Sequence, residues 1–140
     1  MNFFERELAK IAANCKNIRN TKFVGGACIG RLTDEVTVKI QMICLNLNTQ
    51  YNALHIMLIN RCEGCVDKHN IRLDDLWGEF TTPAGNQISP HIWKHGRDIK
   101  WYGCVPTSAQ FQQLSNAVDE YLECFTEPEQ TESEDMDLSI

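Results

Sequence analysis

The segment Glu35–Asn60, EVTVKIQMICLNLNTQYNALHIMLIN, constrains the fold more than any other part of the chain. Apolar side chains alternate with mostly polar ones from Val36 to Cys44, which is the period of a half-buried β-strand. After a polar break, Ala53–Ile59 is apolar at every position except His55, as in a strand covered on both faces. A helix is the competing interpretation of this second run, but the run is short. We therefore expect two antiparallel strands at the centre of a sheet.

Two amphipathic helices are expected, one near each end of the chain. Asn2 is followed three residues later by Glu5, which is the pattern of a capping box, and apolar residues then recur at helical spacing. Thr107 and Gln110 repeat that pattern near the start of Val105–Phe125, where the apolar positions again follow a helical period. Both helices should pack their apolar faces on the sheet.

Two further strands and one irregular segment complete the predicted fold. Lys22–Leu32 is expected as one strand, in which three glycines mark a bulge or a close backbone approach. Lys68–Leu73 alternates and is expected as the fourth strand. Asp74–Cys104 contains all three tryptophans, so we expect an ordered excursion over one sheet face, with a short strand at Ile99–Tyr102. The predicted class is α+β: an antiparallel meander sheet of about four strands, with an N-terminal and a C-terminal helix packed on it.

The distribution of charge predicts where the folded part ends. Residues 126–140 carry six of the nineteen acidic residues and no Lys or Arg, so thirteen acids balance thirteen bases elsewhere. We expect residues 1–125 to form a single domain and residues 126–140 to be a disordered acidic tail. Solubilisation is the simpler role for the tail, and a short peptide motif at Met136, Leu138 and Ile140 is the alternative. A neutral body provides no overall field to attract nucleic acid.

The chain is expected to be cytoplasmic. No apolar run approaches the length that spans a bilayer. Phe3 and Phe4 are followed at once by three charged residues, which leaves no apolar signal-peptide core. The seven cysteines are odd in number and scattered, as is typical of reduced thiols in an intracellular protein.

Two pairs of residues have the local spacing of zinc ligands. Cys62 and Cys65 form a C-x2-C pair, His91 and His95 form an H-x3-H pair, and His69 could replace either histidine. However, 25 residues separate the two pairs, where a zinc finger has about 12–15. The simpler interpretation is two cysteines in a turn and two surface histidines. We expect no metal and no other cofactor, and these pairs are the ligands to test first if a metal is present.

No coherent set of catalytic residues is expected. The glycine-rich run Gly25–Gly30 lacks the Lys-Ser/Thr ending of a phosphate loop. Cys28 could act as a nucleophile only with a histidine base, and His55 lies on a neighbouring predicted strand. Free cysteine is among the most buried residue types, so a small core side chain is the simpler interpretation of Cys28. We therefore expect a protein that is not an enzyme.

Aromatic and basic residues interleave between positions 91 and 102. Such a segment could stack nucleic-acid bases and contact phosphates. The simpler interpretation is an aromatic clasp on the core, with the cationic side chains in water. The candidate binding residues are Trp93, Lys94, Arg97, Lys100, Trp101 and Tyr102.

Short phrases spread along the chain carry a resemblance to a known group. The chain is similar to uncharacterised small proteins of conjugative elements and prophages of Firmicutes, over about Thr21 to Phe125. Cys62 and Cys65 depart from the pattern of that group, and the resemblance implies a habitat but no established activity. The phrases are ACIGRL (27–32), NR (60–61), VDK (66–68), DLWG (75–78), ISPHIW (88–93), WYG (101–103) and PT (106–107).

Two classes of function follow from these observations. The first is a non-enzymatic, protein-binding accessory protein of a mobile genetic element, such as an inhibitor or modulator of a host defence nuclease (anti-CRISPR-like). The alternative is a small nucleic-acid-binding module, with or without zinc, that uses the aromatic–basic segment 91–102. The predicted partner is a host or element-encoded protein; nucleic acid is not favoured and no membrane is expected.

Overall fold

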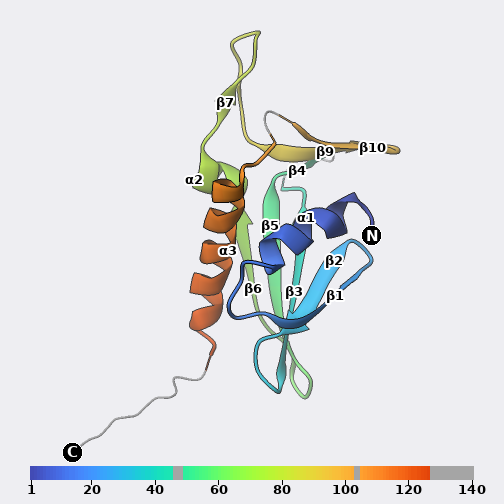
Figure 1. The fold of residues 1–140 in the computed structure, drawn as a ribbon, viewed down its shortest axis with the longest axis vertical. Coiled ribbons are helices and arrows are strands. Elements are labelled where there is room, and N and C mark those ends of the chain that lie inside the picture. Colours follow the sequence, from blue (N-terminus) through green and yellow to red (C-terminus); the bar gives the residue numbers. More distant parts are fainter. Residues whose placement is uncertain (46–48, 103–104, 127–140) are drawn as a thin grey trace, which may run out of the picture.

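The computed structural model describes residues 1–45, 49–102 and 105–126, and its centre is a five-stranded antiparallel sheet (Figure 1). Its central strands β3 and β5 pair along their whole lengths, so the antiparallel pairing predicted for the central segment is confirmed. In sheet order, the five strands are β1 (Arg19–Val24), β2 (Ala27–Arg31), β3 (Val36–Ile43), β5 (Ala53–Asn60) and β6 (Gly64–Arg72).

The α+β class is confirmed, but the predicted meander of about four strands is wrong in two respects. Residues 22–32 form two strands rather than one, because Gly25 and Gly26 adopt φ values of 61° and 77° and make a tight hairpin turn. In addition, β4 (Gln50–Tyr51) leaves the main sheet between β3 and β5 and pairs with β9 (His91–His95). The main sheet is therefore not a strict meander.

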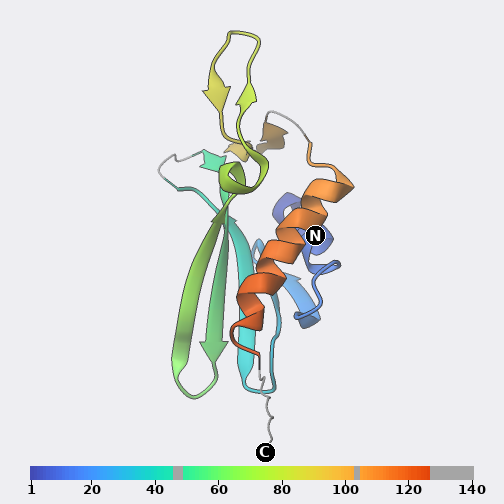
Figure 2. The same cartoon turned by 90° about the vertical axis from the view of Figure 1, so that its left-hand side faces the viewer.

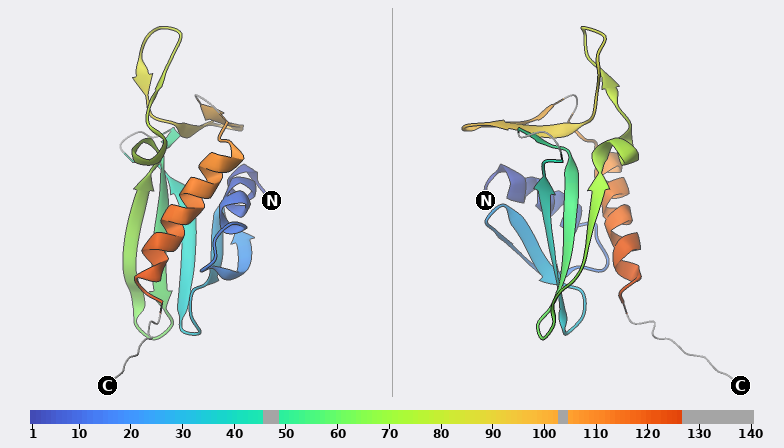
Figure 3. Two further views of the ribbon diagram at one scale, coloured as in Figure 1. Left: turned by 60° about the vertical axis from the view of Figure 1, so that its left-hand side comes forward. Right: turned by 180° about the vertical axis from the view of Figure 1, so that it is seen from behind.

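Two helices, α1 (Phe3–Ala12) and α3 (Ser108–Glu123), cover the same face of this sheet (Figures 1 and 2). Both begin with the predicted capping box: Asn2 Oδ1 accepts from the Glu5 amide at 2.9 Å. The hydroxyl of Thr107 likewise accepts from the Gln110 amide, at 3.1 Å. In the view from behind, the strands of the main sheet lie in front of both helices (Figure 3, right).

The core lies between the helices and the face that they cover, which we call the inner face. Alternate sheet residues are buried there against α1 and α3. The prediction that Ala53–Ile59 is covered on both faces is wrong, because His55, Met57 and Ile59 are only half-buried on the opposite, outer face. No helix of the described residues packs on that outer face. Fully buried side chains of the core include Leu8, Val38, Ile40, Leu54, Ile56, Leu58, Leu114 and Leu122.

The described residues between β6 and α3 form one short helix and two hairpins. Trp101 packs edge-on against Phe111 at 6.3 Å, and its Nε1 donates to Glu7 Oε1 at 2.8 Å, as expected for an aromatic clasp on the core. No described helix is long and apolar enough to cross a membrane. The elements in this segment are α2 (Leu73–Trp77), β7 (Phe80–Thr81), β8 (Gln87–Ile88), β9, and β10 (Asp98–Tyr102), which contains the strand predicted at 99–102.

Candidate functional site

The two pairs with zinc-ligand spacing lie at opposite ends of the main sheet. Cys62, in the connection between β5 and β6, and Cys65, at the start of β6, are exposed, whereas His91 and His95 belong to β9 beyond the other end (Figure 1). His91 is buried and stacks on Tyr102, with ring centroids 5.1 Å apart. Across residues 1–45, 49–102 and 105–126, no three His, Cys, Asp or Glu side chains are grouped to hold a metal ion.

Cys28 and His55 do not form a catalytic pair. Cys28 pairs with Ile40, and Ile40 pairs with Ile56, so the thiol points into the core on the inner face. His55, one residue before Ile56, points to the outer face, where its Nδ1 lies 2.7 Å from Asn70 Oδ1. Burial raises the pKa of Cys28 to about 11, so its thiol is neutral at physiological pH.

The predicted aromatic–basic segment is the hairpin β9–β10, and its residues divide between two faces. Trp93 pairs with Lys100, whose Nζ lies 5.3 Å from the Trp93 ring centroid, and Tyr102 lies on the same, more exposed face. Trp101 lies on the other face and packs on the core. Lys94 shares that second face, and Arg97 is in the exposed turn. The structure therefore brings together only three of the six predicted residues as a surface.

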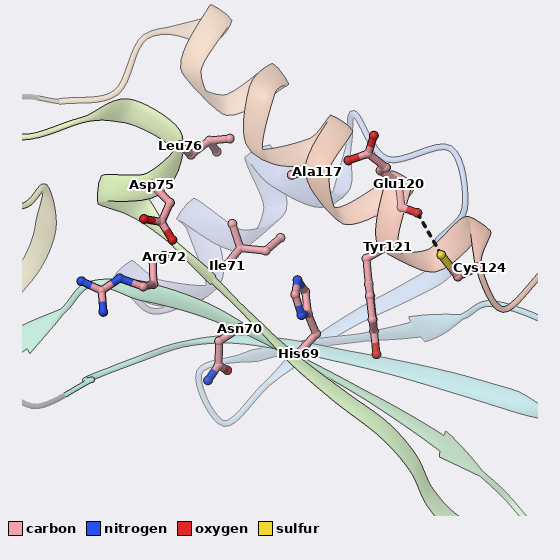
Figure 4. A pocket seen from close by; sticks show the side chains of 10 residues that line it. All are labelled: His69, Asn70, Ile71, Arg72, Asp75, Leu76, Ala117, Glu120, Tyr121 and Cys124. Atoms are coloured by element: carbon pink, nitrogen blue, oxygen red, sulfur yellow. Dashed lines mark hydrogen bonds between the residues drawn. The ribbon is translucent and has the colours of Figure 1, made fainter.

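An open groove that the sequence did not reveal runs between the edge strand β6 and helix α3 (Figure 4). Its volume is about 440 Å³, and its floor is formed by Ile71, Leu76 and Ala117. Its rim carries Asp75 on α2 and Glu120 on α3. The remaining lining residues are His69, Asn70 and Arg72 of β6, and Tyr121 and Cys124 at the end of α3.

One end of the groove is closed by a ring stack. His69 of β6 and Tyr121 of α3 stack with centroids 4.6 Å apart and an angle of 17° between the rings. The Tyr121 hydroxyl donates to the carboxylate of Asp67, two residues before His69 on the same strand. Burial, together with this neighbouring carboxylate, raises the pKa of Tyr121. The stack thus fastens the last turns of α3 to β6 and fixes the width of the groove.

The backbone of β6 beside the groove has free hydrogen-bonding groups. The Leu73 amide donates to the Asn52 carbonyl at 3.0 Å, so Arg72 and Ala53 face each other in a pair without direct hydrogen bonds. Because the pattern repeats every two residues, Arg72, Asn70 and Lys68 turn both backbone groups away from β5. Within the described part of the chain, no backbone partner pairs with these outward groups.

The opposite end of β6 is held by side chains of the neighbouring excursion. The Arg72 guanidinium binds the Asp74 carboxylate in a fork, at 3.0 and 2.8 Å, and Ser89 Oγ donates to the same carboxylate at 2.9 Å. The Arg72 hydrogen bonds, with a smaller one from Ser89, lower the pKa of Asp74 to about 2. β6 is thus fastened at both ends of the groove while its edge stays open.

The alternation of residues 68–73 indicated a strand, but not that the strand lies at an edge. Ala117 in the floor of the groove and Cys124 just after α3 gave no sequence signal, because a small residue on a helix flank is common. Comparison with known proteins gave no match to this chain, either among family models, among curated proteins or among solved structures. Function therefore has to be inferred from the geometry of β6 and its neighbours.

Proposed function

We propose that this protein is a non-enzymatic protein-binding module that holds a segment of its partner at the edge of β6. The single observation that supports this function best is an open groove of about 440 Å³ along a strand whose outward backbone groups are free. Such an edge accepts an extended peptide as an additional strand, with backbone hydrogen bonds for affinity and a side-chain groove for specificity.

The partner that we propose is a host protein, with a defence nuclease as the specific case. This choice rests on the resemblance of the sequence to small proteins of conjugative elements and prophages, which implies a habitat inside a host cell. Reduced thiols support a cytoplasmic site of action, and they are found at Cys15, Cys28, Cys62, Cys65 and Cys124. Neutral, buried Cys28 supports a binding role rather than thiol catalysis.

A second candidate function is binding of single-stranded nucleic acid by the hairpin β9–β10. The observation that favours it is the exposed face on which Lys100 lies over Trp93, next to Tyr102. An aromatic surface with a nearby cation stacks bases and contacts phosphates. Asp98 lies on the same face of the hairpin and opposes a continuous basic surface, so we rank this function second.

Capture from a host lysate, followed by mass spectrometry, tests the first function and separates it from the second. Asn70→Pro removes the outward amide in the middle of β6, and Asn70→Ala is the matched control that keeps this amide. We expect a protein that the wild-type chain and Asn70→Ala capture and that Asn70→Pro does not. Capture that the proline leaves unchanged would contradict a site at β6. Nuclease-sensitive capture that Lys100→Glu abolishes would favour the nucleic-acid function.

A further inference from the structure

The backbone of β6 defines how an additional strand would place its side chains. A strand that pairs with Lys68, Asn70 and Arg72 extends the sheet by one position, and its side chains alternate between the two faces. Side chains opposite His69 and Ile71 fall on the groove side, against α3. Side chains opposite Lys68 and Asn70 fall on the outer face. The occupant therefore has two chemically distinct sides.

The outer side of the site carries the cation of Lys68. Lys68 ends a row across the outer face in which Lys22, Ile29, Lys39 and Met57 follow one another by strand register. This row contains no carboxylate, and its lysines make no ion pair with any described residue. A carboxylate next to Lys68 would therefore gain a favourable cross-strand pair.

The groove side has the opposite preference. Its floor is apolar, with Ile71, Leu76 and Ala117, and its rim carries the carboxylates of Asp75 and Glu120 (Figure 4). An acidic side chain placed there would be repelled and would lose water, whereas an apolar side chain would be buried. The site thus accepts a strand that alternates between acidic residues on one side and apolar residues on the other.

The last six residues of this chain have that alternation. Residues 135–140 read DMDLSI, so Met136, Leu138 and Ile140 occupy one side and Asp135, Asp137 and Ser139 the other. Five apolar or acidic residues of six therefore match the two sides of the β6 site. The alternation has the period of a strand, which a purely solubilising tail does not need.

The connection is long enough for this segment to reach β6. The described chain ends at Thr126, directly after helix α3, whose Tyr121 and Cys124 line the end of the groove. Residues 127–134 would link Thr126 to the segment, and eight extended residues span about 26–29 Å. A six-residue strand is about 20 Å long. A linker of this reach permits pairing in either direction along β6.

From these observations we propose that residues 135–140 pair with β6 of the same chain as a sixth strand, with Met136 and Leu138 in the groove. This inference rests on the proposed function, because it assigns an internal competitor to the same site. A partner segment then has to displace the chain's own C-terminus, and it has to present the same acidic and apolar alternation. Covering the edge also keeps β6 from pairing with a second molecule.

Residue-resolved amide hydrogen exchange in the full-length chain tests this pairing. Met136→Asp/Leu138→Asp places two carboxylates on the groove side, and Gln130→Asp/Ser133→Asp is the matched control, with the same added charge outside the segment. We expect the amides of Lys68, Asn70 and Arg72 to exchange about tenfold faster in the first variant than in the wild type or the control. The amides of His69 and Ile71, which bond to β5, should be unchanged.

Three results would overturn the pairing. Equal exchange of the three outward amides in all three chains would exclude the segment as occupant. Equal acceleration by the control would assign the effect to charge alone. Protection that disappears on dilution would place the segment of a second molecule on β6. The two proposals can also fail separately. If Asn70→Pro abolishes lysate capture while the amides of Lys68, Asn70 and Arg72 exchange equally in the wild type and both double variants, the partner site stands and only the internal competitor is excluded. If these amides are protected by residues 135–140 but no host protein is captured through β6, the internal strand is supported and the partner site is excluded.

Discussion

The two edge strands of the main sheet, β1 and β6, differ in whether a further strand can pair with their outward backbone groups. β1 is irregular: its register with β2 shifts between Arg19 and Lys22, and Asn20 has a φ of 55°. β6 keeps a regular register with β5 from Asp67 to Arg72, and its only shift lies nearer its start. A bulge twists an edge away from further pairing, so β1 is protected and β6 is not. This difference supports the proposal that β6 binds an additional strand.

The protection of β1 also involves a close contact between neighbouring chain segments. Gly30 of β2 lies against Ile18 and Arg19, and a Cβ added there would collide with the Ile18 side chain and lie 3.0 Å from the Arg19 carbonyl oxygen. For Gly30, this is the second of the two alternatives, a bulge or a close backbone approach, that the glycines of residues 22–32 predicted. The approach holds the start of β1 in its irregular path. Among the described residues, β6 has no comparable close backbone approach, and its side chains hold it instead through the His69–Tyr121 stack and the Arg72–Asp74 pair.

The largest expected effect concerns the helix that supports the open edge. Leu114→Ala should lower the free energy of unfolding by about 2–5 kcal/mol, because this fully buried side chain would leave a cavity. Gln113→Ala is the control: Gln113 directly precedes Leu114 and is exposed, so this variant should change stability by less than about 0.5 kcal/mol. Urea unfolding measures both values. Equal urea midpoints for the two variants would contradict the packing of α3 on the sheet. The groove would then lose the helix that bounds it.

An intermediate effect is expected at β1, the protected edge of the sheet. Gly30→Ala should destabilise the protein by about 1–3 kcal/mol, because the new methyl group forces Ile18 and the Arg19 backbone to move. The amides of β1 should then exchange faster, while those of β6 keep their wild-type rates. Thermal unfolding and amide exchange check the two parts. A neutral substitution would mean that the close approach does not hold β1.

The smallest effect is expected at the ion pair beside β6. The pKa of Asp74 is lowered from 3.8 to about 2, so the pair contributes stability above pH 4 and loses it as the pH falls towards 2. Asp74→Asn should cost at most about 1 kcal/mol at neutral pH, because Arg72 is largely exposed. Asp74→Asn should also reduce the loss of stability between pH 4 and pH 2. Asp75→Asn is the control and should leave that loss unchanged. Unfolding measured against pH would contradict the assignment if Asp74→Asn retained the full loss.

Local patterns predicted the parts of the fold that depend on neighbours in sequence. Both capping boxes and the pairing of the central strands follow from spacing alone. The turn at Gly25-Gly26 was missed, because glycines inside an apolar run were interpreted as a bulge or a close backbone approach within one strand. The open edge could not be predicted, because whether β6 has one neighbour or two depends on contacts between distant segments. The cysteine and histidine pairs had suitable spacing but lie at opposite ends of the sheet. The expectations for residues 46–48, 103–104 and 127–140 lie outside the described residues.

The central claim is that β6 turns the backbone of Asn70 away from the sheet and that of Ile71 towards it. Denaturant unfolding of proline and alanine variants at both positions tests this directly, since the alanine variant at each position accounts for the lost side chain. Proline should cost less relative to alanine at position 70 than at position 71, because the missing amide has no partner in the five-stranded sheet and loses at most the proposed bond to residues 135–140. At position 71 it should cost about 1–3 kcal/mol more than alanine, because a carbonyl of β5 loses its donor. The reverse order, or equal costs at the two positions, would contradict an open edge at β6.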